Sequence, residues 1–355
     1  MSNLRVTRLH DEQIAELIRC KARVYDREPD EHPDRYRWKF FQNPHRGKEV
    51  PFWLLWDGDR MLGGIGALPV RMLLFGTEIA GEFACEMFIE KGQQRSGLGT
   101  VLMDAYIADS PLPLMMNTSQ SLHRFLVKRG FHDLSVGLHF WVRPIRPGAM
   151  LAARWSGIKA RAALLSGPLL RAAVEVRAAT LRPPSDPSVR VEEVGGFGGW
   201  AEDLWAAAGA AYPVIVIRDL AYLRWKYERH YVHKYRILRA VDGKGTRGYL
   251  VHRLRPEARG PLMVVQELFT RHDDQGARLA LLQHALKEAR RADAFAIKLM
   301  TSTRSYGADL RRLGFFATRS SPGLLYPEQP GFDRPDLRDI SNWFLSSGDS
   351  DLDYA

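Results

Sequence analysis

The chain contains a weak internal duplication, and this feature limits its fold more than any other. The matching stretches are 36–40 with 222–227, 86–89 with 267–270, and 129–131 with 313–315. Measured from Trp38, Glu86 and Gly130, the offsets are 187, 181 and 184 residues, a spread that a few loop residues explain. Because 355 residues are enough for two domains of ordinary size, the duplication predicts two copies of one fold.

Both copies show the same order of predicted elements: a strand, two helices, a three-stranded antiparallel meander, and then alternating helices and strands. In the first copy these segments are 4–9, 11–25, a helix around Trp38, 52–56, 64–74, 79–89, 97–108, 112–116, 121–129 and 131–142. The second copy repeats the order from 190 to 326. The predicted fold class is therefore mixed α/β (α+β), with a central, mostly antiparallel twisted sheet flanked by helices in each domain.

The predicted domains are 1–143 and 189–330, joined by a Pro/Arg-rich linker at 144–188 and followed by an acidic tail at 331–355. From Arg143 to Arg182 the linker has eight basic residues and one acid, Glu175. Apolar residues recur there every three or four positions, flanked by Arg154, Lys159 and Arg161, which predicts a basic amphipathic helix broken near Gly167-Pro168.

Two interpretations of the linker stay open. Its apolar stripe packs on one or both domains, or it docks to an acidic carrier protein, an anionic membrane surface or an anionic effector. The tail has six Asp residues and an apolar anchor, Trp343-Phe344-Leu345, so it is either disordered or docked on the body of the protein.

Composition restricts the class of protein. Hydrophobic residues make up 45% and charged residues 26% of the chain, which is typical of a globular protein. Two cysteines are too few for a disulfide framework, no secretory signal or long apolar run is visible, and we expect a cytoplasmic protein that can also lie at the inner membrane face. The net charge of +10 favours anionic partners, but no nucleic-acid-binding motif and no metal-binding His or Cys pair occurs, so neither nucleic acid nor a metal is expected.

The sharpest local signal is the loop Gln94-Arg95-Ser96-Gly97-Leu98-Gly99, which lies between a predicted strand ending at Ile89 and a predicted helix. Glycines at a helix N-terminus leave backbone N–H groups free and allow a pyrophosphate to approach closely. A dinucleotide-binding fingerprint does not fit, because the preceding strands form a meander, and a Walker loop lacks its Gly-Lys-Ser/Thr. A tight turn with a helix cap is the simpler alternative.

The loop and its context resemble the GNAT acyltransferase superfamily. The resemblance rests on the strand Glu86-Met87-Phe88-Ile89, the Gln/Arg-x-x-Gly-x-Gly/Ala loop and the helix end Lys128-Arg129-Gly130-Phe131, and the duplication extends it to a tandem GNAT protein. In the second copy the loop reads Asp273-Asp274-Gln275-Gly276-Ala277-Arg278, where two carboxylates would repel phosphate. We therefore expect the first copy to bind acyl-CoA and the second to be a degenerate domain that serves as a scaffold or as a wall of the acceptor site.

The resemblance implies roles for residues of the first copy. Glu86 is the first candidate for the general base and Glu82 the second, because without a bulge they face the same side of one strand. The family places Asn and Tyr where this chain has Ser119 and Leu126, so His123 or water is the candidate general acid. The other predicted site residues are Phe88, Ile89, Gln94, Arg95, Ser96, Gly97, Leu98, Gly99 and Ser119 for the donor, and Trp38 and Lys39 at the acceptor cleft, with a buried helix as the simpler interpretation of Trp38.

These features together predict an N-acyltransferase that moves an acyl group, with acetyl expected, from acetyl-CoA or another acyl-CoA to a primary amine by direct attack in a ternary complex. The acceptor is a small-molecule or sugar amine. One alternative donor is an acyl carrier protein bound by the basic linker. A second alternative is a non-catalytic GNAT pair that binds or senses an effector, because the family's Tyr and Asn are missing.

Overall fold

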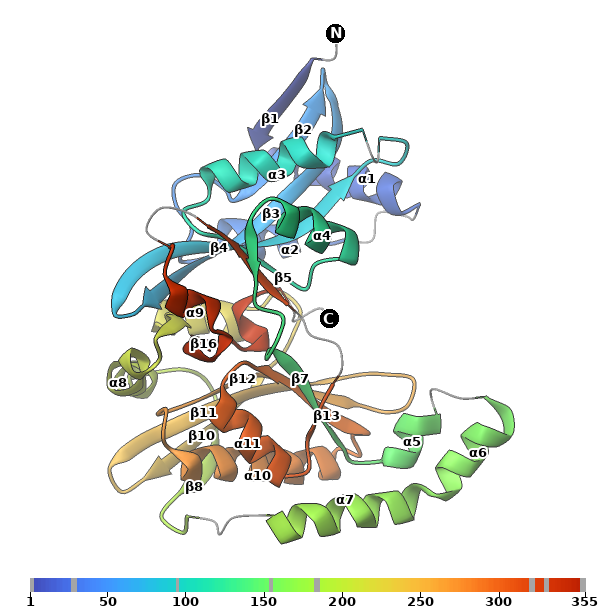
Figure 1. The fold of residues 1–355 in the computed structure, drawn as a ribbon, viewed down its shortest axis with the longest axis vertical. Helices are drawn as coiled ribbons and strands as arrows, with labels where there is room; N and C mark the ends of the chain where they lie inside the picture. The colour runs from blue at the N-terminus through green and yellow to red at the C-terminus, as the bar shows by residue number, and fades with distance from the viewer. Residues whose placement is uncertain are drawn as a thin grey trace.

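The computed structural model describes residues 3–26, 31–93, 96–152, 156–181, 186–318, 323–328 and 332–351 (Figure 1). Two mixed sheets, mostly antiparallel and flanked by helices, lie one after the other along the long axis of the molecule. The predicted fold class is confirmed. Within the described ranges, no helix combines the length and apolar character that a membrane-spanning segment needs.

The first half begins with a strand and helices and continues with a meander of three strands. Its elements are β1 (Leu4–Arg8), η1 (Asp11–Gln13), α1 (Ile14–Tyr25), α2 (Pro33–Tyr36), the π-helical turn η2 (Arg37–Phe41), β2 (Phe52–Asp57), β3 (Arg60–Leu74), β4 (Thr77–Ile89), α3 (Leu98–Asp109), β5 (Pro113–Met116), α4 (Gln120–Lys128), β6 (Phe131–Asp133) and β7 (His139–Pro144).

The linker forms three helices, and the second half then repeats the order of the first. The linker helices are α5 (Pro147–Ala152), α6 (Gly157–Leu165) and α7 (Gly167–Leu181). The second half comprises β8 (Arg190–Val194), α8 (Gly199–Ala208), η3 (Gly209–Ala211), β9 (Val214–Val216), α9 (Leu220–Leu223), the π-helical turn η4 (Arg224–Glu228), β10 (Arg236–Asp242), β11 (Gly245–Arg255), β12 (Leu262–Thr270), α10 (Gln275–Arg291), β13 (Ala296–Thr301), α11 (Arg304–Arg312), β14 (Phe316–Ala317) and β15 (Leu324–Pro327). The tail adds η5 (Pro335–Arg338), η6 (Ile340–Asn342), β16 (Trp343–Phe344) and η7 (Ser347–Asp349).

The two halves exchange their last strands. The first sheet has the order β1-β2-β3-β4-β5-β15-β6, and the second has the order β14-β7-β13-β12-β11-β10-β8. β7 therefore pairs with β13 of the second half, while β15 pairs with β5 and β6 of the first. The predicted domain 1–143 thus contains a strand of the second sheet, and the predicted domain 189–330 contains two strands of the first, β15 and β9, the latter paired with β3.

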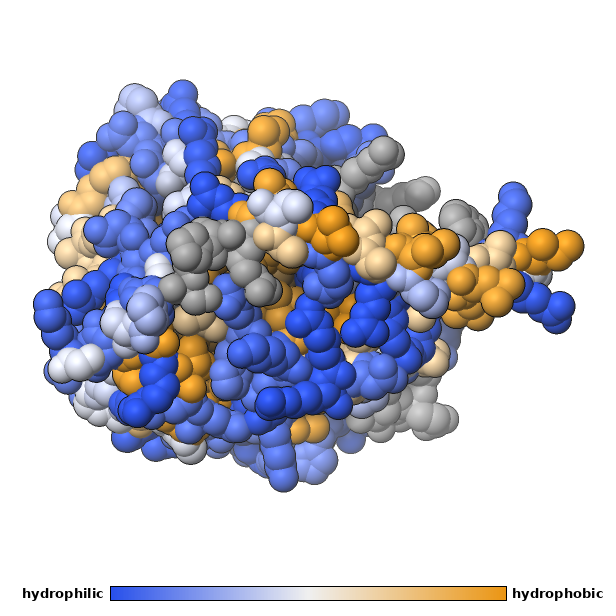
Figure 2. All heavy atoms as spheres, turned by 90° about the horizontal axis from the view of Figure 1, so that it is seen from below, coloured by the Kyte–Doolittle hydropathy of each residue, from blue (hydrophilic) through white to orange (hydrophobic). Residues whose placement is uncertain are grey.

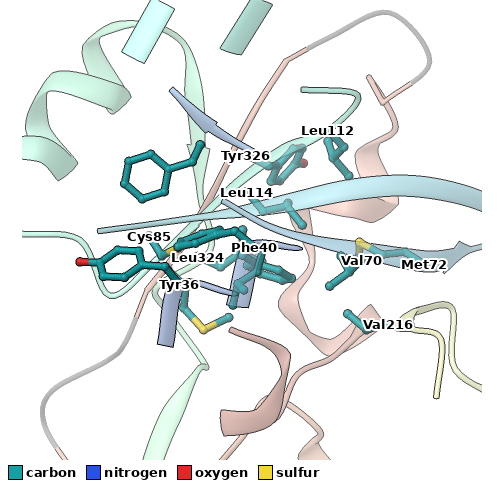
Figure 3. Close-up of a cluster of buried hydrophobic side chains, with 14 of the residues drawn as sticks. Tyr36, Phe40, Val70, Met72, Cys85, Leu112, Leu114, Val216, Leu324 and Tyr326 are labelled. Atoms are coloured by element: carbon teal, nitrogen blue, oxygen red, sulfur yellow. The ribbon is translucent and has the colours of Figure 1, made fainter. Parts of the chain in front are cut away.

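The first sheet packs helices on both faces, as its alternating residues require. On β2, Phe52 and Leu54 face α1 and α2, whereas Trp53 and Leu55 face α3 and α4. Figure 3 shows the core on the α2 side, which includes Phe40, Val216 of β9 and Leu324 of β15. This core therefore contains side chains from both halves of the chain.

Two tryptophans related by the duplication join the halves. The rings of Trp38 and Trp225 stack with centroids 4.9 Å apart. Each indole N–H donates to the carbonyl oxygen of the other residue, at 3.0 and 2.8 Å. Trp38 is therefore a buried residue of the interface, as the simpler interpretation of its helix expected.

The linker and the tail behave differently from each other. The linker helix breaks between α6 and α7 at Gly167, as predicted, but its apolar stripe does not pack on the domains, because Ile158, Leu165 and Leu169 are exposed. The tail is docked and not disordered over its described part, since Trp343, Phe344 and Leu345 are buried and β16 pairs with β9. The structure thus places the tail, up to Asp351, between the two sheets.

Candidate functional site

A β-bulge in β4 shapes the candidate site. Gly64 pairs with Phe88 and Gly66 pairs with Cys85, so Glu86 and Met87 together oppose one residue of β3. Glu86 has a φ of +55°, a conformation that is costly for a residue with a side chain and that is typical of functional sites. Beside the bulge, Gly66 lets the Phe40 ring pack closely on the sheet, because a Cβ there would lie 2.7 Å from that ring.

A cleft opens where β4 separates from β5. The two strands pair in parallel only from 82–84 to 113–115, and beyond that point β4 continues beside β3 but without β5. The cleft contains two adjoining cavities that share Met87, Ser119 and Leu122. The outer cavity, of about 520 Å³, reaches Gly97, and the inner one, of about 300 Å³, is lined by Cys85, Glu86, four methionines and Asp351.

The N-terminus of α3 faces the outer cavity without a cap of its own. Gly97 is the N-cap residue, has a φ of +89° and contributes no capping side chain. The amides of Leu98 and Gly99 begin the helix and so have no acceptor in a preceding turn. Gly97, Gly99, Phe88, Ile89 and Ser119 all line this cavity, so the structure brings together most of the predicted donor-binding residues.

The remaining predicted donor residues lie around this loop. Leu98 is buried, and Ser96 precedes the helix with its hydroxyl against the carbonyl oxygen of Gln93. Gln94 and Arg95 lie outside the described residues. Ser119 caps α4, because its Oγ accepts from the amide of Leu122 at 3.3 Å.

Glu86 lies among three cations. Its carboxylate accepts from Lys39 Nζ at 2.7 Å, from Lys21 Nζ at 2.9 Å and from Arg35 Nη2 at 2.9 Å. Burial would raise the pKa of Glu86, but Lys39, Lys21 and Arg35 outweigh it and hold the pKa well below its ordinary value. A carboxylate stabilised in this way accepts a proton poorly, which weighs against the predicted role of Glu86 as the base.

Asp351, at the described end of the tail, is a second carboxylate of the inner cavity, and sequence reasoning missed it. Its Oδ2 lies 3.3 Å from Lys39 Nζ, and its side chain is only partly buried. Lys39 therefore lies in the site, as predicted, between Glu86 and Asp351. Burial lowers the pKa of Lys39, yet Cys85, Glu86 and Asp351 together raise it above its usual value, so the side chain stays charged.

Three predicted residues do not reach the cleft. Glu82 is turned to the other side of β4, because the bulge removes the condition under which it would share a face with Glu86. It lies beneath α3, where burial raises the pKa of its carboxyl. His123 pairs with Asp133 at 2.9 Å on the outer side of α4, and Trp38 belongs to the interface between the halves, so neither is among the residues that line the two cavities.

Comparison with solved structures identifies the fold. A GCN5-related N-acetyltransferase from Anabaena variabilis matches with a TM-score of 0.62 at 12% identity, over 91% of this chain and 72% of that chain. A probable N-acyltransferase from Enterococcus faecalis gives 0.61 at 12%, over 92% and 72%. The chain has the GNAT fold, in two copies.

A third match covers the chain still more evenly. The Saccharomyces cerevisiae N-myristoyltransferase with bound myristoyl-CoA superimposes with a TM-score of 0.59 at 11% identity, over 97% of this chain and 90% of that chain. No family model and no curated protein sequence matches the chain. At these identities the structural matches establish the GNAT fold alone.

In the second GNAT copy the tail occupies the position of the cleft. β12 and β13 pair in parallel from 262–265 to 296–299 and then separate, as β4 and β5 do. Ser346 bridges to Thr301 at this point, and Asp349 Oδ1 accepts from the buried Arg218 at 2.6 Å. A Cβ at Gly348 would lie 2.0 Å from the hydroxyl of Tyr227, so the tail fills this space closely.

The helix that corresponds to α3 is also different in the second GNAT copy. Asp274 caps α10, because its Oδ1 accepts from the amide of Ala277 at 2.9 Å. The same carboxylate pairs with Arg247 at 2.7 Å. A side chain of the protein therefore caps the N-terminus of α10, whereas the N-cap residue of α3, Gly97, provides no capping side chain.

Proposed function

We propose that this protein is an acyl-CoA-dependent N-acyltransferase whose donor binds in the cleft of the first GNAT copy. The observation that supports this most is an asymmetry. The first copy has an open cleft beside an uncapped helix N-terminus at Gly97, whereas in the second copy the tail fills the cleft and Asp274 caps the helix. This difference between the two copies is what we expect if only the first copy binds the donor.

The residues of the first copy fit an acyl-CoA donor. The amides of Leu98 and Gly99 and the positive end of α3 suit a diphosphate. Met87, Leu122 and Phe125 provide apolar walls for the pantetheine arm. The bulge at Glu86 and Met87 leaves a residue out of the ladder, and its amide is available to polarise the thioester carbonyl.

The reaction is a direct transfer. The nitrogen of a neutral primary amine attacks the thioester carbon, a C–N bond forms, the C–S bond breaks and the thiolate leaves. The amine must first give up a proton, because its reference pKa lies well above neutral pH. Asp351 is the candidate proton acceptor, since it lines the inner cavity, is only partly buried, and pairs with Lys39 but not with the Lys21 and Arg35 that also hold Glu86.

The departing thiolate does not require an acid from the protein. A free thiol has a pKa of about 8.5, so its thiolate is a tolerable leaving group near neutral pH. Water entering the partly open cleft can protonate it. This replaces His123, which the structure places outside the cleft lining.

The test is a binding measurement with acetyl-CoA on wild type and Gly97→Glu. A glutamate at this position places a negative charge where the diphosphate should lie, so we expect Kd to rise at least about tenfold. Gly76→Glu is the matched control, because Gly76 has a φ of +83° and, like Gly97, nothing within 4 Å of the added Cβ. Equal affinity of the Gly97 variant and wild type would show that the donor does not bind here.

Turnover separates the enzyme from the non-catalytic alternative. Acetyl-CoA is mixed with a panel of amines, including amino sugars, amino acids and polyamines, and free thiol release is measured. The expected result is release that depends on one class of amine and falls in Gly97→Glu. Binding of acetyl-CoA without thiol release from any amine would favour a sensing module.

A further inference from the structure

The linker helices α6 and α7 follow each other across a bend at Gly167 (Figure 1), and we call residues 156–181 the linker arm. Only Ala163 and Ala178 of this segment are buried. Glu175 fixes α7 to the second half, because its carboxylate lies 3.1 Å from Arg143 and 2.7 Å from Arg290. α6 and the beginning of α7 lie beyond this attachment and extend outward (Figure 1).

The linker arm exposes large aliphatic side chains. Ile158 is 85% exposed, Leu165 82% and Leu169 77%. Leu164, Val176 and Leu181 are also exposed. Figure 2 shows that apolar residues gather on the part of the molecule that stands out at this end, with hydrophilic residues beside them. An exposed aliphatic cluster of this kind marks a surface that is covered in the working protein.

The charges beside this cluster have one sign. The linker arm contains Lys159, Arg161, Arg171 and Arg177. Its single acid, Glu175, forms ion pairs with Arg143 and Arg290. Over the described part of the chain, Lys159 and Arg161 form no ion pair with a carboxylate. Aliphatic side chains next to unneutralised cations suit a surface that is apolar inside and anionic outside.

We propose that the linker arm is a peripheral membrane-docking element that binds an anionic phospholipid bilayer. Ile158, Leu165 and Leu169 enter the acyl boundary of the bilayer, and Lys159 and Arg161 contact the lipid phosphates. The binding is interfacial, since α6 and α7 have 9 and 15 residues and lie along the surface. It is independent of the proposed acyl transfer.

Two other partners, a second copy of the chain and a carrier protein, fit the linker arm less well. A symmetric dimer through this surface would set the same cations of two copies against each other. A carrier protein would have to dock beside the cleft of the first copy to deliver its acyl arm. Figure 1 places α3 near one end of the long axis and α7 at the other, so the linker arm is remote from that cleft.

Co-sedimentation with vesicles tests the proposal on the full chain. The vesicles contain phosphatidylcholine with phosphatidylglycerol, or phosphatidylcholine alone. The apolar variant is Ile158→Gln/Leu165→Gln/Leu169→Gln, since Gln keeps a good helix propensity, and the charge variant is Lys159→Glu/Arg161→Glu. Val136→Gln is the matched control, because Val136 is 88% exposed and lies outside the linker. Each variant is first shown to have the thermal midpoint and acetyl-CoA affinity of wild type.

The expected result is that wild type and Val136→Gln bind the anionic vesicles, and that binding weakens with added salt. The apolar variant should lose at least about a hundredfold in partition coefficient, because three aliphatic side chains leave the interface. The charge variant should bind anionic and neutral vesicles equally weakly. The proposal would be overturned if wild type did not bind vesicles, or if binding survived both variants. It would also be overturned by a dimer in gel filtration that depends on the linker arm and is not accompanied by vesicle binding.

Discussion

At the scale of single residues, the ion pairs of Glu86 predict a large contribution to stability. Its carboxylate lies within 2.9 Å of donor atoms from α1, α2 and η2, through Lys21, Arg35 and Lys39. Of the carboxylates beside these cations, Glu86 pairs with all three, whereas Glu31 pairs with Lys21 and Arg35 and Asp351 pairs with Lys39. Three ion pairs therefore hold Glu86 in its positive-φ conformation near the end of β4.

We predict that Glu86→Gln destabilises the protein by about 3–5 kcal/mol, because it removes the one carboxylate that pairs with Lys21, Arg35 and Lys39 together in a largely buried cluster. The pH dependence of stability should also change. Since the folded pKa of Glu86 lies below its unfolded value, its contribution is complete above about pH 4.5 and is lost as pH falls through the folded pKa. Urea unfolding from pH 3 to 7 measures both effects. An unchanged acid limb in the variant would show that Glu86 does not contribute there.

Asp351 makes the opposite prediction, of a large effect on rate and a small one on folding. Asp351→Asn should lower the rate of thiol release about 100-fold or more, the usual effect of losing a general base, without changing the Kd of acetyl-CoA. The loss should shrink as pH rises toward the pKa of the amine, because a neutral amine needs no base. Asp336→Asn, an exposed residue of the same tail, is the control. A pH-independent loss would indicate a structural role.

At the scale of elements, α3 and α10 show how one helix N-terminus changes its use. Gly97 begins α3 without a capping side chain, whereas Asp274 begins α10 with a carboxylate that is bound to Ala277 and Arg247. The pair Asp273-Asp274 indicated this difference in the sequence, since carboxylates repel phosphate. The tail that fills the neighbouring cleft gave no such signal, because an apolar Trp-Phe-Leu anchor does not specify where it docks.

We predict that Asp274→Gly does not create a second donor site. The variant should lose about 1–3 kcal/mol of stability, because a helix cap and an ion pair are removed. Acetyl-CoA should still bind with one site per chain, since Ser346 and Asp349 continue to occupy the second cleft. Isothermal titration calorimetry gives the stoichiometry, with Asp273→Gly as a control that leaves the cap intact. Two sites in Asp274→Gly would show that the tail does not block the cleft.

At the scale of the whole molecule, the duplication predicted the architecture but not the exchange. Periodicity located the strands: β2 (Phe52–Asp57) and β5 (Pro113–Met116) each differ by one residue from the predicted segments 52–56 and 112–116. Alternating apolar residues require a strand to lie in a sheet, but they do not say which sheet, and β7 would satisfy its pattern beside β5 as well as beside β13. The bulge at Glu86 was also beyond sequence reasoning, so Glu82 was placed on the wrong face.

The exchange predicts that neither half of the chain folds alone. A fragment of residues 1–145 lacks β15, so β5 and β6 have no strand between them, and a fragment of residues 186–355 lacks β7, so β13 and β14 are separated in the same way. Each fragment also exposes its half of the Trp38–Trp225 stack and of the shared core around Phe40 and Val216. Expressed separately, each fragment should show no cooperative thermal transition by circular dichroism. Co-expressed, the two should purify as a stable pair with a single transition, as should intact protein cleaved within the linker after folding. Two fragments that each melt cooperatively would mean that the strands can return to their own sheets, and that the exchange is not needed for either GNAT copy to fold.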